Sequence, residues 1–364
     1  MDRVVVVGAG IAGMTIAVEL ARRGARVQVI ADPSRSPTTP VAAGMLAPAA
    51  ETDFGEDLLV RLEQDARTAW EALAATLERN GDTDVLFEVR GSLVAAQTPG
   101  DLDHLRRMVD LQRRFGMTAS LLGARDLVDL EPALSSHLAG GALLPDDAQV
   151  DNRRALAAYD TWAAKLGIER IEAAVRAVHP DAVELADTSR LQADTVVVAA
   201  GSWLRDLVEV ALQPVRGVTI RGTLPVGLAP RHCLRGELRG RRVYIVPRAS
   251  HEIVIGATSD EAPLTDRDPR ARDLLDLLDD ARTLAPAMGE LAVTDVSVGF
   301  RPATPDNLPI VGRGDDGVWV HGGHYRHGIL LAPFTATLLA DAIVGDGVDP
   351  RLAALSPTRL RSRA

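Results

Sequence analysis

The chain has 364 residues, 46% of them hydrophobic and 25% charged, which is enough for a large core and for two domains. The formal net charge is −10 and no run of Lys or Arg stands out, which argues against a nucleic-acid partner. A single cysteine, Cys233, excludes an intrachain disulfide framework and a multi-thiolate metal site, and it suits a cytoplasmic protein. No targeting segment is visible. The apolar stretch 328–344 contains Pro333 and Asp341, so we expect a buried helix there and no membrane partner.

The N-terminal residues predict a βαβ unit. Residues 4–7 are a run of β-branched side chains, residues 14–23 carry apolar side chains at helical spacing, and residues 27–30 have the composition of a second strand. A unit of this kind implies a right-handed crossover and a parallel sheet. Two later apolar segments, 195–200 and 317–320, lead into glycine as the first strand does, so we expect them in the same sheet.

The segments between these strands have other patterns. Residues 54–80 and 101–130 are predicted to be helical, whereas 215–260 alternate apolar and polar side chains, as in a half-buried antiparallel sheet. The simplest assembly is an α/β protein in which a discontinuous Rossmann-like nucleotide-binding domain carries an inserted antiparallel-sheet substrate domain. The expected boundaries are 1–85, 150–215 and 296–364 for the first domain, and 86–149 and 216–295 for the second.

Three glycines between the first strand and the first helix form a dinucleotide-binding pattern. Gly8 allows a tight turn, Gly10 lets a pyrophosphate approach the backbone, and Gly13 lets helix and strand pack closely. The N-terminus of the helix then faces the phosphate charge. The pattern alone is weak evidence, but here it lies in the βαβ context that it requires.

The residues after the second strand bear on which dinucleotide is bound. Ala31 stands where a ribose-binding acid is usual, and Asp32 follows; it could reach the ribose hydroxyls or simply start the turn at Pro33. Ala31 therefore weakens an NAD interpretation. Residues 38–46 are small and include Gly44, which suits a loop that lies against a flavin, although an ordinary Ala-rich loop has the same composition.

Seven segments occur in a familiar order along the chain: residues 8–13, 42–46, 198–203, 244–248, 255–258, 299–302 and 322–333. Together they resemble the D-amino-acid-oxidase superfamily of FAD-dependent enzymes. Within it they are most similar to the glycine oxidases, which supply an imine for the thiazole ring of thiamine. The last segment discriminates best among the branches of this superfamily.

By position, the resemblance implies a set of residues that hold non-covalent FAD. Ile11 and Ala12 would lie at the pyrophosphate and Ala31 and Asp32 at the ribose, with Val175 near the adenine. Cys233 is a poor candidate for a covalent flavin link. The other implied cofactor residues are Gly8, Gly10, Gly13, Thr38, Thr39, Ala43, Gly44, Met45, Ala200, Gly201, His324, Tyr325, Arg326, His327, Gly328, Ile329 and Leu330.

The resemblance also implies that Arg301, Tyr244 and Arg326 bind and orient the substrate carboxylate. A guanidinium suits this task because it makes two parallel charge-assisted hydrogen bonds to a carboxylate. The alternatives are a surface salt bridge for Arg301, a packed aromatic for Tyr244 and a solvated loop for Arg326. His324 and His327 have no carboxylate or thiolate at useful spacing, so we expect no metal.

The helix predicted over 328–344 would direct its positive N-terminus at the pyrimidine edge of the flavin, with Pro333 tolerated only near the first turn. The implied chemistry then needs no acid or base residue, because a neutral substrate amine and correct orientation suffice for hydride transfer. Ser259 is a candidate for the pocket wall that sets substrate size.

The implied activity is oxidative deamination of glycine, and also of sarcosine or small D-amino acids, to an imine and glyoxylate. Molecular oxygen would be reduced to hydrogen peroxide, the imine would feed thiazole synthesis, and the resemblance allows a homo-oligomer. Two other functions stay open: a D-amino-acid dehydrogenase that passes electrons to a quinone or carrier, and a non-catalytic dinucleotide-binding redox sensor. An NAD-dependent dehydrogenase is disfavoured by Ala31 and the 42–46 loop.

Overall fold

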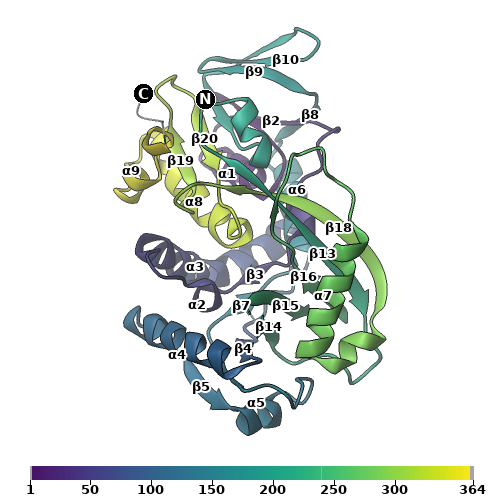
Figure 1. Cartoon of the computed structure of the whole chain (residues 1–364). Coiled ribbons are helices and arrows are strands. Elements are labelled where there is room, and N and C mark those ends of the chain that lie inside the picture. Colours follow the sequence, from purple (N-terminus) through teal and green to yellow (C-terminus); the bar gives the residue numbers. More distant parts are fainter. Residues whose placement is uncertain (1, 239, 361–364) are drawn as a thin grey trace.

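A computed structural model describes residues 2–238 and 240–360, and two sheets organise it (Figure 1). The first has six strands, of which five run parallel and the edge strand β19 is antiparallel. The expected βαβ unit and the two later strands all lie in it, so this prediction is confirmed. In order across the sheet the strands are β19 (Ile310–Arg313), β20 (Trp319–Gly322), β12 (Thr195–Val198), β1 (Arg3–Val7), β2 (Arg26–Ala31) and β8 (Glu169–Glu172).

Both faces of this parallel sheet are covered, which explains its unbroken apolar runs. Val4 and Val6 of β1 point into a core formed with helices, whereas Val5 and Val7 point into a core on the opposite face. The helices are α1 (Ile11–Arg22), α3 (Asp57–Gly81), α6 (Asn152–Lys165) and α8 (Gly328–Val344). The opposite face packs against the small sheet of β9 (Val175–His179), β10 (Ala182–Leu185) and β11 (Arg190–Gln192), seen at the top of Figure 1.

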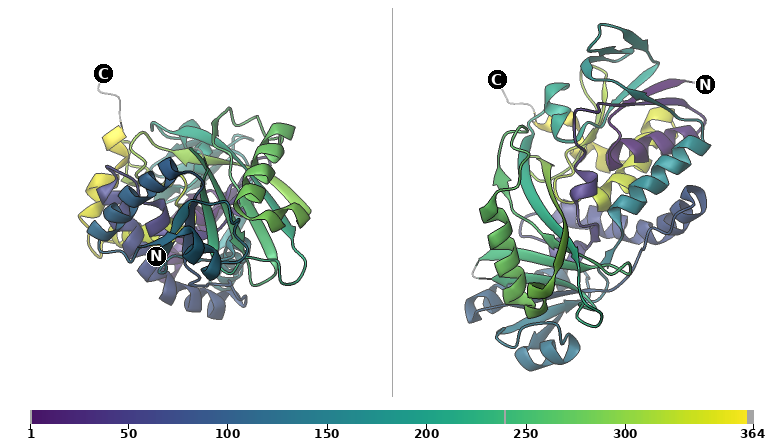
Figure 2. Two further views of the ribbon diagram at one scale, coloured as in Figure 1. Left: turned by 60° about the horizontal axis from the view of Figure 1, so that its bottom comes forward. Right: turned by 90° about the vertical axis from the view of Figure 1, so that its right-hand side faces the viewer.

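The second sheet is large, with nine strands, and antiparallel except where β14 pairs with β4. Helix α7 (Ala271–Leu284) covers one face of it, as the right panel of Figure 2 shows, and α4 (Pro99–Arg114) and α5 (Ala124–Leu130) pack at its far end. Its strands are β17 (Asp260–Glu261), β13 (Gln213–Thr223), β16 (Glu252–Gly256), β15 (Arg241–Pro247), β14 (Cys233–Leu238), β4 (Ser92–Ala96), β6 (Gly140–Leu144), β5 (Ser120–Gly123) and β18 (Ala292–Ala303).

Two details of the sequence interpretation are wrong. Residues 101–130 are not helical throughout, because β5 separates α4 from α5 and pairs with β6. The sheet over 215–260 is not half-buried, because the central residues of β13 are buried on both faces. The polar side chains of β13 such as Arg216, Thr219 and Arg221 are buried and hydrogen-bonded instead of facing water.

Short elements complete the described part of the chain. They are β3 (Met45–Leu46) paired with β7 (Ala148–Gln149), α2 (Pro48–Glu51), α9 (Arg351–Leu355), and four 3-10 turns at Thr39–Val41, Gly201–Asp206, Pro286–Glu290 and Pro357–Leu360. No helix among the described residues is long and apolar enough to cross a membrane. The two-domain division remains a proposal, and its boundaries at 215/216 and 295/296 fall within β13 and β18.

Helix α8 contains Pro333 in its second turn, deeper than we expected from the sequence. A proline there has no N–H to bond the carbonyl four residues earlier, which is that of Ile329. The indole N–H of Trp70 on α3 donates to that carbonyl at 3.2 Å and to the Leu330 carbonyl at 3.1 Å. Trp70 is only 1% exposed, so a buried side chain from another helix replaces the missing bond.

We expect Trp70→Phe to lower the free energy of unfolding by about 1–3 kcal/mol beyond the loss due to ring size, because it leaves buried carbonyls without a donor. Trp162→Phe is the matched control, since Trp162 is 5% exposed and its indole N–H has no partner in the described part of the chain. Urea unfolding of both variants gives the difference. Equal losses would show that the Trp70 hydrogen bond does not stabilise α8.

Candidate active site

A cavity of about 890 Å³ lies between the two sheets. Its walls include the segments that follow three parallel strands: residues 8–12 after β1, 199–201 after β12 and 322–330 after β20. The carboxyl ends of parallel strands are the usual ligand site in such sheets. The large sheet closes the other side with residues of β13, β15 and β18.

The fingerprint glycines are required by close backbone contacts. A Cβ on Gly8 would lie 2.4 Å from the Ala199 carbonyl oxygen, and a Cβ on Gly13 would lie 1.8 Å from the Gly8 carbonyl oxygen. Gly13 does not line the cavity, so its role is the helix–strand packing expected of the third glycine. The N-cap residue of α1, Gly10, has no side chain, and Thr39 Oγ1 accepts only the Ile11 N–H, at 3.0 Å. The first turn has no acidic residue, so the N-terminal end of α1 is suited to an anion.

Asp32 holds the turn after β2, one of the two roles expected for it, and its contact with a ribose stays a prediction. Its Oδ1 accepts hydrogen bonds from Ser34 N at 2.9 Å and from Ser34 Oγ at 2.7 Å, so it does hold the turn after β2. It also lines the cavity beside Ala31. These hydrogen bonds and the nearby Arg35 keep the pKa of Asp32 below its ordinary value, although burial raises it.

The loop over residues 39–43 is held from outside the cavity by its carbonyl groups. All five carbonyls accept a side-chain hydrogen bond from one of four buried residues, which lie on β13, on α6 or directly after β15. Asn152 donates to the carbonyl of residue 39 at 2.6 Å, Thr219 to that of residue 41 at 3.0 Å, and Arg248 to that of residue 43 at 2.5 Å. Arg221 donates to the carbonyl of residue 40 at 3.2 Å and to that of residue 42 at 2.9 Å. The loop backbone is thereby fixed against the cavity.

Gly44 ends this loop in a conformation that only glycine adopts easily. Its φ is +70°, and a Cβ would lie 2.0 Å from the Val150 carbonyl oxygen. The chain can therefore pass between the cavity and Val150 only without a side chain here. Met45 follows and lines the cavity.

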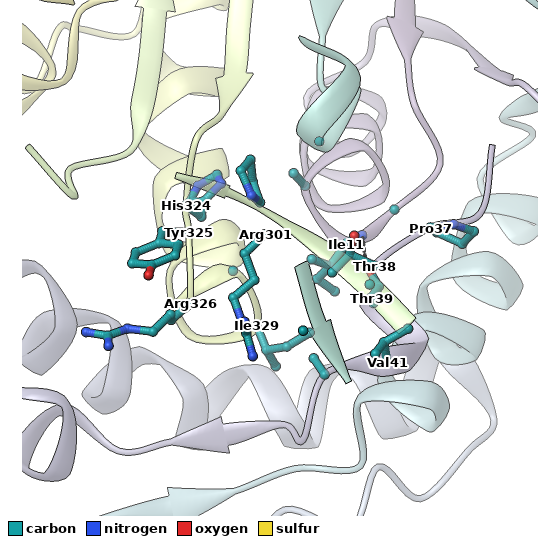
Figure 3. Close-up of a pocket in the computed structure, with 18 of the residues that line it drawn as sticks. Ile11, Pro37, Thr38, Thr39, Val41, Arg301, His324, Tyr325, Arg326 and Ile329 are labelled. Carbon is teal, nitrogen blue, oxygen red and sulfur yellow. Dashed lines mark hydrogen bonds between the residues drawn. The ribbon is translucent and has the colours of Figure 1, made fainter. Parts of the chain in front are cut away.

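Arg301 extends from β18 into the middle of the cavity (Figure 3). It stands opposite Val215 of β13, and its guanidinium lies across Gly217, where a Cβ would be 2.5 Å from Nη1. Nη1 donates to the Thr258 carbonyl at 3.1 Å, and no carboxylate of the described residues lies within ion-pairing distance. A guanidinium group that lies in a cavity without a carboxylate partner is suited to binding an anion.

The backbone that carries Arg301 is also fixed. The carbonyl of Phe300 accepts hydrogen bonds from Thr38 Oγ1 at 2.8 Å and from Ser202 Oγ at 2.7 Å. These donors come from the loop after β2 and from the segment after β12. The position of Arg301 is thus tied to both walls of the cavity.

Tyr244 of β15 lies across Gly256, where a Cβ would be 2.3 Å from the phenol oxygen. Burial raises its pKa, although Arg301 opposes this, so the hydroxyl stays protonated and can donate a hydrogen bond into the cavity. The alternation along β15 places Val243 and Ile245 in the core under α7 and Tyr244 on the cavity side.

Arg326 lines the cavity but extends in a different direction from Arg301 (Figure 3). Its Nε lies 3.6 Å from Glu51 Oε2, and its guanidinium lies 5.2 Å from the centre of the Tyr325 ring. Glu51 also pairs closely with Arg235 of β14. Arg326 is therefore occupied by a carboxylate of the chain itself, unlike Arg301.

A model of the DAO family, described as FAD-dependent oxidoreductases, matches residues 3–342. The chain belongs to this family. The resemblance, the Rossmann-like fold class and FAD as the cofactor are thereby confirmed.

The relatives found by comparison agree with the family assignment. Glycine oxidase of Geobacillus kaustophilus is 32% identical over 372 residues, 98% of this chain and 96% of that protein. Its crystal structure superposes with a TM-score of 0.92 at 30% identity, covering 100% of both chains. The bifunctional protein ThiO/ThiG of Synechocystis is 32% identical over 365 residues, and these cover 98% of this chain but only 54% of that protein. The chain thus spans about half the length of its bifunctional relatives.

The residues present fit FAD. The glycine turn and the N-terminal end of α1 suit a pyrophosphate, and the cavity continues past the fixed 39–43 loop to the N-terminus of α8. Cys233 is buried, and burial raises its pKa to about 12, so it remains an unreactive thiol. Within the described ranges no group of three His, Cys, Asp or Glu side chains could hold a metal ion.

The structure brings nearly all the residues named from the sequence to this one cavity. Gly13 is the exception described above. Those that line it are Tyr244, Arg301, Arg326, Gly8, Gly10, Ile11, Ala12, Ala31, Asp32, Thr38, Thr39, Ala43, Gly44, Met45, Val175, Ala200, Gly201, His324, Tyr325, His327, Gly328, Ile329 and Leu330, together with Ser259.

Sequence reasoning missed Glu51 and Arg235, which also line the cavity. Glu51 is the first carboxylate after Asp32 and follows an Ala-rich stretch. This isolated position could have marked it as a candidate site residue. Arg235 had a weaker signal, as one arginine in an alternating strand. The two arginines beside Glu51 hold its pKa well below its ordinary value, although burial raises it.

Beneath these residues, Asp147 caps the short helix that ends at Glu51. Its carboxylate oxygens accept from Ala49 N at 3.1 Å and from Ala50 N at 3.3 Å. Burial raises its pKa to about 7, although Ser92, Arg235 and the two amides lower it. The folded chain therefore holds this proton more tightly than the unfolded chain does.

Because the folded pKa of Asp147 is the higher one, its contribution to stability is lost as pH rises from the unfolded pKa to about 7. We expect wild type to lose about 2–3 kcal/mol of unfolding free energy relative to Asp147→Asn between pH 5 and 8. Urea unfolding at both pH values measures this. A pH-independent difference between the two proteins would contradict the shifted pKa.

Proposed function

We propose that the chain catalyses FAD-dependent oxidation of glycine, and also of sarcosine and small D-amino acids, to the imine. The imine then hydrolyses to glyoxylate or is passed on as dehydroglycine for the thiamine thiazole. Molecular oxygen takes the electrons and becomes hydrogen peroxide. The cavity-lining residues named above would hold the cofactor.

The observation that carries this proposal is the guanidinium of Arg301, which lies in the cavity without a carboxylate partner among the described residues. Its remaining N–H groups can bind a substrate carboxylate in two parallel hydrogen bonds, which fixes the orientation of the adjacent carbon. A redox sensor without a substrate would leave this cavity guanidinium without an anion to bind.

The phenol of Tyr244 supplies a second, neutral donor to the same carboxylate. The bound flavin supplies hydride acceptance, which adds one negative charge to its isoalloxazine ring. Among the chain's own residues, Arg301 and Tyr244 orient the substrate. The substrate amine reacts as the free base. Catalysis is therefore mainly orientation.

The relatives support the substrate and the physiological role. Glycine oxidases share the full length of the chain, and the bifunctional relatives join a ThiO part to ThiG in one protein. This arrangement supports delivery of the product to thiazole synthesis.

An anaerobic titration of the holoprotein with glycine tests the proposal through the yellow flavin absorbance. We expect bleaching with glycine, followed by return of the colour and formation of peroxide on exposure to air. Bleaching without rapid return in air would move the function to a dehydrogenase that uses a quinone or carrier. A yellow protein that neither glycine, sarcosine nor D-alanine bleaches would refute an amino-acid oxidase.

A further inference from the structure

The function proposed above gives no role to the contact between two buried charged side chains, His327 and Glu63. His327 and Glu63 are 2% and 1% exposed, and His327 Nδ1 lies 2.5 Å from Glu63 Oε1. His327 precedes the first residue of α8, and Glu63 lies on α3, the helix that packs beside it. Burying such a pair costs free energy, so its presence calls for a reason beyond packing.

His327 is one of the residues at the cofactor cavity. His327 lines it together with Gly328 and Ile329, the first residues of α8. Its Nε2 is buried and has no hydrogen-bond partner among the described residues, whereas Nδ1 is taken by Glu63. An N–H group without a partner, beside the uncapped N-terminus of a helix with no acid in its first turn, is an arrangement suited to negative charge.

The surrounding carboxylates favour the protonated imidazole. Burial lowers the pKa of His327, but the carboxylates of Glu63 and then Glu51 raise it above its ordinary value, against the opposing charge of Arg326. His324, on the same loop, is buried and its pKa is well below the ordinary value, so it stays neutral. Of these two histidines, His327 is the one whose protonated form the surroundings favour.

We propose that the His327–Glu63 pair presents a fixed positive charge to the flavin and stabilises the negative charge that the isoalloxazine gains on reduction. Glu63 acts through His327 and is a positioning residue. The proposal rests on the FAD site of the family and not on the choice of glycine as substrate. It predicts that the pair raises the reduction potential of the bound cofactor.

The test uses the FAD-loaded protein, with sulfite as the probe because sulfite adds to oxidised flavin and gives an anionic adduct. Glu63→Gln keeps the shape of the side chain but removes its charge. We expect it to weaken sulfite binding about tenfold and to lower the two-electron midpoint potential by the equivalent of about 30 mV. Glu63→Asp keeps the charge and should stay within about twofold of wild type. If Glu63→Gln does not retain FAD, His327→Gln carries the same expectation.

Trp70→Phe is the matched control, since Trp70 lies on the same helix as Glu63 and bonds the same end of α8 without carrying a charge. It should lower stability and leave the sulfite affinity and the potential unchanged. Wild-type values for the charge-removing variant, or an equal shift in Trp70→Phe, would overturn the proposal. Neither readout involves glycine, so a failed glycine titration and a failed charge assignment are distinguishable.

Discussion

Replacing Arg301 with Ala is expected to lower kcat/KM for glycine about a thousandfold, mainly through a higher KM, while FAD stays bound. The variant removes a charge-assisted pair of hydrogen bonds and leaves the substrate carboxylate in the cavity without its cation, which costs about 2–5 kcal/mol. Steady-state peroxide formation over a range of glycine concentrations measures the effect, and the flavin spectrum reports cofactor retention.

Two further variants separate charge from geometry. Arg301→Lys keeps the positive charge but loses the planar fork, so we expect an intermediate loss of about 10- to 100-fold. Arg313→Ala is the matched control, because Arg313 lies outside the cavity lining and stacks on Trp319. An unchanged KM in Arg301→Ala would place the carboxylate clamp elsewhere in the cavity.

The sequence predicted those parts of the fold that depend on local pattern. The valine runs of β1 and β12 are buried on both faces, and a parallel sheet needs such continuous apolar strands, so their pairing could be inferred. The glycine fingerprint could be interpreted because its spacing lies in a βαβ unit, although the contact that requires Gly8 is with the distant Ala199 and only that of Gly13 with Gly8 is local. Tyr244 and Arg301 were named through resemblance, since an arginine or tyrosine in a strand carries no local signal of its role.

What the sequence did not indicate depends on contacts between distant segments. The Trp70 bond to Ile329 joins residues 259 positions apart, and the ion pair of Glu51 with Arg235 spans 184 positions. The half-buried sheet was predicted wrongly for the same reason. The sequence shows that β13 contains polar residues, but not that Arg216 bonds Asp273 and Arg221 bonds the Ala42 carbonyl.

The formal net charge of −10 counts arginines that are buried and that therefore contribute little to the charge of the surface. Arg221 and Arg248 are 0% and 4% exposed, and both donate to carbonyls of the 39–43 loop. Their guanidinium groups donate hydrogen bonds to backbone carbonyls between the two sheets, and they add little to the surface charge. The cofactor cavity therefore depends on polar groups that come from the large sheet.

Arg248→Met is accordingly expected to weaken FAD binding about 100-fold and to lower the unfolding free energy by about 2–5 kcal/mol. It leaves two buried carbonyls, those of Ala43 and Val150, without the donor that now lies at 2.5 Å from each. Equilibrium FAD titration of the apoprotein and urea unfolding measure the two effects. Arg190→Met is the control, since Arg190 is half-exposed on β11 and should change stability by less than about 0.5 kcal/mol.

The decisive comparison is the glycine KM of Arg248→Met at saturating FAD. Arg248 does not line the cavity, and the Arg301 and Tyr244 side chains do not depend on it for a hydrogen bond. KM should therefore stay within about threefold of wild type once the cofactor is bound, in contrast to Arg301→Ala. A large rise in KM with normal FAD affinity would mean that Arg248 acts on the substrate end of the cavity, and that the 39–43 loop is held by its other donors alone.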